Sequence, residues 1–155
     1  MRYCRGRVES NIDNGEADVT RSLARIETRH LRAGLWGLAI FVVLGLVLEG
    51  LHAIKAPFYL DAGQETTRLL LRLSHAHGTL VSLVNVVYAL VVRARPAAAS
   101  PVGSACLSAS LVLLPAGFLL GGLFAHGGDP GLGVLLVPPG ALALAAGIAV
   151  TARRV

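Results

Sequence analysis

The chain has 155 residues, of which 54% are hydrophobic and 15% charged, and its mean hydropathy is +0.66. A soluble domain carries about 25% charged residues, so this chain has too few to cover a water-facing surface. The composition excludes a disordered chain, a fibrous repeat and a nucleic-acid-binding domain, although the formal net charge is +5. We therefore predict an all-α integral membrane protein whose first partner is the lipid bilayer.

Residues 1–32 form a polar, charged N-terminal segment, and the chain then changes to four apolar stretches. A helix needs about 20 residues to cross the hydrocarbon core of a bilayer. The stretches predict a bundle of four transmembrane helices within one domain over residues 33–155, with helices at about 33–54, 65–92, 101–125 and 131–151. A shorter fourth helix that begins near Pro138 is the alternative, because proline lacks the backbone donor that a helix interior uses.

The basic residues are distributed unevenly around these helices. All but three of the 14 Lys and Arg residues belong to the N-terminal segment, to the connection after the second helix or to the C-terminal end; the exceptions are Lys55, Arg68 and Arg72. Loops rich in Lys and Arg stay in the cytoplasm, so we predict that both termini are cytoplasmic. His30 then lies on the cytoplasmic side, and the other four histidines fall at the outer membrane level.

Polar side chains at that outer level form a candidate ligand cluster. Glu49 and His52 are three residues apart, so they share one face of the first helix. His77 lies near the outer start of the second helix, and His126 lies at the outer end of the third. Imidazole binds Zn, Cu, Fe and Ni and often holds haem, so these four residues are candidate ligands of a metal ion or haem. One alternative is that the histidines face lipid headgroups and water without binding a ligand, and another is that the polar groups handle a proton or a substrate.

The second predicted helix has a polar stripe that continues into the bilayer. Polar side chains inside a membrane are costly, so we expect this stripe to face the bundle interior. His75 falls on the opposite, arginine-rich side, which makes His77 the inward histidine of the pair. The stripe consists of Ser74, His77, Val81, Asn85 and Tyr88.

The first two predicted helices resemble a group of known proteins. The string Leu48-Glu49-x-Leu51-His52, followed by Ser74-His75-Ala76-His77-Gly78, resembles small bacterial membrane proteins of unknown function. The resemblance covers about residues 21–90. It implies a four-helix protein of the bacterial inner (plasma) membrane and supplies no activity.

The sequence lacks the nucleophile, phosphate-loop, zinc-helix and dinucleotide-binding motifs that mark common enzyme sites. We therefore predict a non-enzymatic accessory or binding protein with the outer-face cluster as its site. One alternative is a structural subunit that packs in a homo-oligomer or a larger membrane complex through small residues such as Gly117 and Gly121. A second alternative is a small channel or carrier, for which only Asn85 and Tyr88 suggest a polar path.

Overall fold

The computed structural model describes the backbone of residues 2–155 and the side chains of residues 16–155. Its described part is all-α, and four of its helical segments are long and apolar enough to cross a membrane. This confirms the predicted bundle of transmembrane helices. The segments are built on α1 (Arg2–Ala53), α3 (Glu65–Ala94), α4 (Pro101–Leu123) and α5 (Val137–Ala152).

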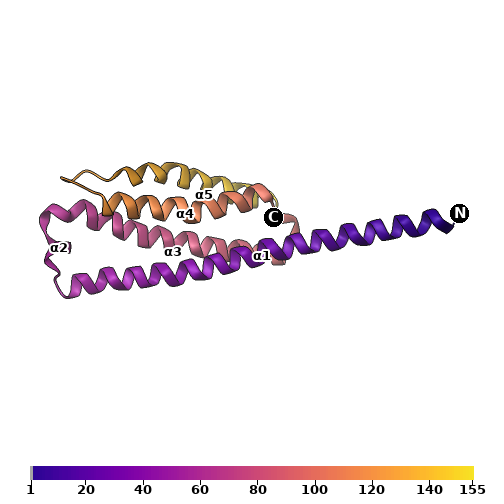
Figure 1. The fold of residues 1–155 in the computed structure, drawn as a ribbon, viewed down its shortest axis with the longest axis horizontal. Coiled ribbons are helices and arrows are strands. Elements are labelled where there is room, and N and C mark those ends of the chain that lie inside the picture. Colours follow the sequence, from indigo (N-terminus) through magenta and orange to yellow (C-terminus); the bar gives the residue numbers. More distant parts are fainter. Residues whose placement is uncertain (1) are drawn as a thin grey trace.

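Helix α1 joins the polar N-terminal segment to the first membrane span without a break. The composition therefore changes at residue 33, but the backbone is helical on both sides of it. The side chains of residues 2–15, including three of the arginines that predict the orientation, lie outside the described residues. In Figure 1, the N-terminal part of α1 projects well beyond the other helices.

The ends of the other helices follow local sequence signals. Helix α3 begins at Glu65, as predicted. Helix α4 begins at Pro101, where proline needs no backbone partner, and the Ser100 hydroxyl accepts a hydrogen bond from the Gly103 N–H. The fourth span starts as the 3₁₀ helix η3 (Leu132–Leu136) and becomes α-helical at Val137. The α-helical part thus begins next to Pro138, as in the shorter alternative.

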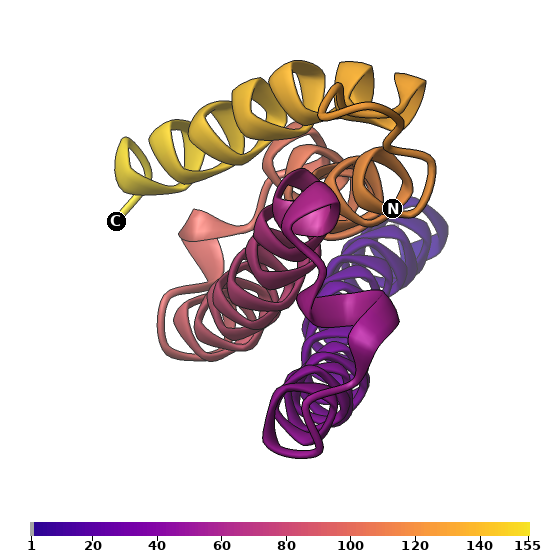
Figure 2. The same ribbon diagram turned by 90° about the vertical axis from the view of Figure 1, so that its left-hand side faces the viewer.

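The membrane helices pack side by side in chain order, with α1 and α5 at the two edges (Figure 1). Both termini lie at one end of the bundle, here called the terminal end. The opposite end, here called the α2 end, carries the short helix α2 (Pro57–Leu60) and the 3₁₀ helix η1 (Ala62–Gln64). The end view shows that α1 and α5 are separated from one another by α3 and α4 (Figure 2).

Glycines allow α1 and α3 to approach closely. A Cβ atom on Gly78 of α3 would overlap the Phe41 ring of α1, and one on Gly45 of α1 would overlap the His75 ring of α3. Each helix therefore places an aromatic ring over a glycine of the other. In lipid there is no hydrophobic force between helices, so they associate through close packing. Small residues allow this packing because they let the two backbones approach each other.

The two edge helices leave most of their surface uncovered. In the most apolar 18-residue stretch of each span, 11% of the residues are buried in α1 and 11% in the span that contains α5. The corresponding share is 39% in α3 and in α4. Large apolar side chains such as Leu35, Val43 and Val47 are more than half exposed on α1. In a membrane these faces contact lipid or other protein helices.

Candidate functional site

Three of the four predicted ligands of the outer-face cluster lie near the α2 end, and His77 lies deeper in the bundle, next to Gly78, which packs on Phe41 of α1. Glu49 and His52 are exposed near the end of α1. His126 is exposed in the turn after α4, where its Nδ1 lies 3.3 Å from the Phe124 carbonyl oxygen. His77 is half-buried and packs its ring on Phe118 of α4, with ring centroids 4.7 Å apart.

The structure does not bring these four side chains together. Within the described residues, no group of three or more His, Cys, Asp or Glu side chains is placed to hold a metal ion. The reason is the order of the helices: Glu49 and His52 stand on the edge helix α1, while His77 turns toward α4 on the other side of α3. A shared ion would need ligands from both sides of α3.

His75 and His77 have separate neighbours, as their spacing requires. The Nδ1 atom of His75 lies 2.7 Å from the Phe41 carbonyl oxygen of α1. The Nδ1 atom of His77 lies 2.9 Å from the Leu73 carbonyl oxygen of its own helix. His75, which we placed on the interfacial side, is thus half-buried between α1 and α3, where Gly45 leaves space for its ring.

The polar stripe of α3 faces the bundle interior, as predicted. Ser74, Val81 and Asn85 have no exposed surface, and Tyr88 is 2% exposed. The Ser74 hydroxyl donates to the Pro115 carbonyl oxygen of α4 over 2.9 Å. Ser74 therefore holds α3 against α4.

A buried polar contact centres on His30, near the terminal end. His30 is 1% exposed, with Nδ1 2.7 Å from Asn85 Oδ1 and Nε2 2.7 Å from Ser104 Oγ. The Arg29 guanidinium also donates to Ser104 Oγ. One histidine thus connects α1, α3 and α4, and we call this set of four side chains the His30 network.

The hydrogen-bond pattern assigns the protons of the His30 network. Asn85 donates its amide N–H to the Val81 carbonyl oxygen over 2.8 Å, so its Oδ1 accepts from His30 Nδ1–H. Ser104 Oγ accepts from Arg29 and donates its hydroxyl proton to His30 Nε2. A neutral imidazole therefore satisfies every partner. Both ring nitrogens are occupied, so His30 holds helices together and is not free to bind a ligand.

The sequence reasoning assigned His30 no role, although a signal for it was present. His30 is placed four residues after Ile26 and four before Gly34, and both of these positions face the bundle. Leu23 and Ile26 pack against the core residues Tyr88, Val92 and Leu107. The face of α1 that contacts the bundle therefore begins within the charged N-terminal segment. His30 belongs to this face because it follows Ile26 by about one helical turn.

Comparison with known proteins adds no family to these observations. No protein-family model matches the chain, and no curated protein or solved structure matches it either. The resemblance of the His-Ala-His-Gly region to small bacterial membrane proteins stays a prediction.

Proposed function

We propose that this chain is a non-enzymatic accessory subunit that packs beside another protein in a bacterial inner membrane, with both termini in the cytoplasm. The observation that carries this proposal is the attachment of α1 along one side only. Helix α1 contacts α3 over its membrane span and leaves the apolar face with Leu35 and Val43 exposed. Such a face is available to a helix of a partner or of a second copy.

The polar groups of the interior support a structural role. Among the described residues, every buried side-chain nitrogen or oxygen except the Tyr59 hydroxyl has a hydrogen-bond partner. Asn85 and Tyr88, the residues that suggested a channel, contact His30 through a hydrogen bond and an edge-on ring contact respectively. The interior polar groups therefore serve helix contacts, and neither a metal site nor a polar path gains support from them.

The projecting part of α1 supplies a second contact region. From Leu23 to Arg2 the helix advances about 30 Å, at about 1.5 Å per residue. The exposed Arg21 lies on this part, and the exposed Arg25 and Arg32 follow it where α1 packs on the bundle. In the predicted orientation these side chains meet anionic lipid headgroups of the inner leaflet. Helix α1 can then contact a partner protein both within the membrane and on its cytoplasmic side.

Photo-crosslinking in native membranes tests this proposal. A photoreactive amino acid at Leu35 or at Val43 is expected to give one discrete crosslinked band. The matched control is the same amino acid at Val81, which is wholly buried between helices and is expected to give none. The measurement is the mass of each product on a denaturing gel.

The mass of the band identifies the kind of assembly. A band at twice the mass of the chain supports a homo-oligomer, and a band at another single mass supports a larger complex. If neither exposed position gives a discrete band and the solubilised protein migrates as a monomer on a native gel, the accessory role is contradicted.

A further inference from the structure

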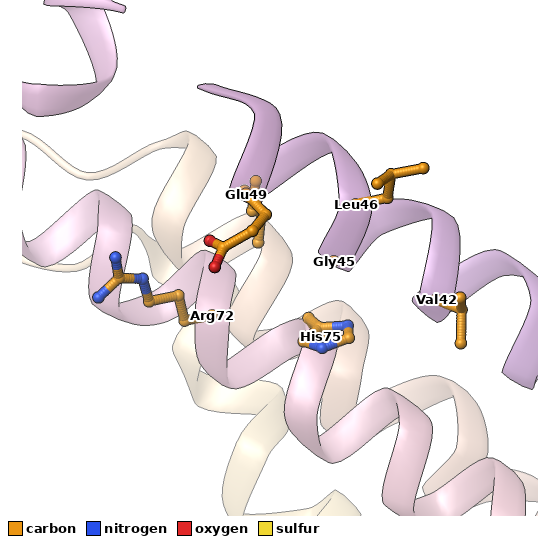
Figure 3. Close-up of a pocket in the computed structure, with 7 residues that line it drawn as sticks. Val42, Gly45, Leu46, Glu49, Arg72 and His75 are labelled. Atoms are coloured by element: carbon orange, nitrogen blue, oxygen red, sulfur yellow. The ribbon is translucent and has the colours of Figure 1, made fainter. Parts of the chain in front are cut away.

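A pocket of about 480 Å³ opens between α1 and α3 near the α2 end. Its apolar wall includes Val42, Leu46 and Leu48 of α1. Val42 and Leu46 are 57% and 72% exposed, so this wall is open to the lipid around the protein. The polar side chains of the pocket are Glu49, Arg72 and His75 (Figure 3).

Glu49 lies at the outer end of the pocket, near the end of α1, whereas His75 lies deeper, opposite Gly45. Helix α1 ends at Ala53, four residues after Glu49, which corresponds to about 6 Å along the axis. The headgroup layer on each side of a bilayer is about 5–7 Å thick. A lipid beside α1 would therefore bring its headgroup to Glu49 and its acyl chains to Val42 and Leu46.

His75 offers one hydrogen-bond acceptor to this pocket. Its Nδ1 lies 2.7 Å from the Phe41 carbonyl oxygen, which can only accept, so Nδ1 carries the proton and Nε2 does not. Nε2 has no hydrogen-bond partner among the described residues, and it is not fully buried. The ring is held in this place because Gly45 has no side chain to displace it.

Glu49 and Arg72 bring opposite charges to the same pocket without neutralising each other. No ion pair joins them among the side chains of residues 16–155. In Figure 3, the Glu49 carboxylate points from α1 toward α3, while the Arg72 guanidinium extends away from it along α3. The pocket therefore presents the Glu49 carboxylate from α1 and the Arg72 guanidinium from α3, with the His75 imidazole deeper between the two helices.

We propose that this pocket binds a phospholipid whose headgroup carries a primary ammonium next to its phosphate, as in phosphatidylethanolamine. The ammonium donates to the Glu49 carboxylate, and the phosphate pairs with the Arg72 guanidinium. The acyl chains lie against Val42 and Leu46. A choline headgroup has no N–H to donate, and a glycerol headgroup has no positive charge to pair with Glu49.

Lipid titration of the purified protein tests this inference. Native mass spectrometry in detergent measures binding of dioleoyl-phosphatidylethanolamine, dioleoyl-phosphatidylcholine and dioleoyl-phosphatidylglycerol. We expect the ethanolamine lipid to bind about tenfold more tightly than the other two, since the choline lipid has no N–H to donate to Glu49 and the glycerol lipid has no positive charge to pair with it. The variant Glu49→Gln is expected to reduce this preference to about twofold.

A second pair of variants separates phosphate recognition from general charge. Arg72→Gln is expected to weaken all three lipids, because each carries the phosphate. Arg93→Gln, at the other end of α3 and likewise exposed, is the matched control and should leave the preference unchanged. Glu49 and Arg72 are exposed, so the far-ultraviolet circular dichroism of these variants should equal that of the wild type.

Three results would overturn the inference. The first is equal binding of the ethanolamine and choline lipids by the wild-type protein. The second is an unchanged preference in Glu49→Gln. Soluble phosphoethanolamine at the same concentration tests the role of the acyl chains, and competition by it at equal strength would also contradict a lipid site.

Discussion

Replacing Gly34 with leucine is expected to separate α1 from α3 and to cost about 3 kcal/mol of unfolding free energy, at the upper end of the range for overpacked sites. A Cβ atom on Gly34 would lie 2.7 Å from the Ser82 carbonyl oxygen and 3.0 Å from the Val86 amide nitrogen. Both are backbone atoms of α3, so no side-chain rotation relieves the clash. The measurement is unfolding in mixed micelles, followed by circular dichroism.

Gly50→Leu is the matched control for Gly34→Leu. Gly50 is on the same helix, and a Cβ atom there would meet no heavy atom within 4 Å. Both variants gain the same helix propensity, about 0.8 kcal/mol relative to glycine. The Gly50 variant should therefore be as stable as the wild type or more stable. Equal stability of the two variants would show that the close approach of α1 and α3 is not a packing requirement.

Replacing His30 with leucine is expected to cost about 2 kcal/mol of unfolding free energy. The change removes both ring nitrogens and leaves Asn85 Oδ1 and the Ser104 hydroxyl without their histidine partner in the interior. Hydrogen bonds between membrane helices contribute about 0.6 kcal/mol on average, and stranding a buried polar group adds about 1–3 kcal/mol. The loss should therefore exceed that of an ordinary surface change.

A double-mutant cycle distinguishes the His30 network from simple loss of packing. If His30 and Asn85 act as a pair, His30→Leu combined with Asn85→Leu should cost at least 0.5 kcal/mol less than the sum of the single changes. His52→Leu, at an exposed position of the same helix, should have no measurable effect. The prediction fails if His30→Leu costs no more than His52→Leu, or if the cycle is additive.

The membrane helices could be predicted from the sequence because their signal is composition over a length set by the bilayer. The start of the span at Glu65 and the stripe with Asn85 and Tyr88 follow from charge and from the helical period, and both agree with the structure. Where composition changes inside one helix, as at residue 33, hydropathy shows where the apolar part begins and does not show where the helix begins.

The candidate site was harder to predict because depth in the membrane does not determine which way a side chain turns. Glu49, His52 and His126 lie near the α2 end, whereas His77 lies deeper, at the depth of Phe41, and turns toward Phe118 of α4. The predicted topology placed His30 on the cytoplasmic side and gave it no partner in the bundle. Its burial depends on contacts with Asn85 and Ser104, which are 55 and 74 residues away in the sequence.

The uninterrupted course of α1 has a mechanical consequence. A helix of this length bends only gently, so its projecting part moves as a lever whose fulcrum is the contact of Leu23 and Ile26 with the bundle. A tilt of about 5° at that fulcrum displaces the far end of a 30 Å arm by about 3 Å, at the helical rise of about 1.5 Å per residue. A neighbour that pushes on the lipid-facing side of α1 would therefore also move the projecting part of the helix, outside the membrane.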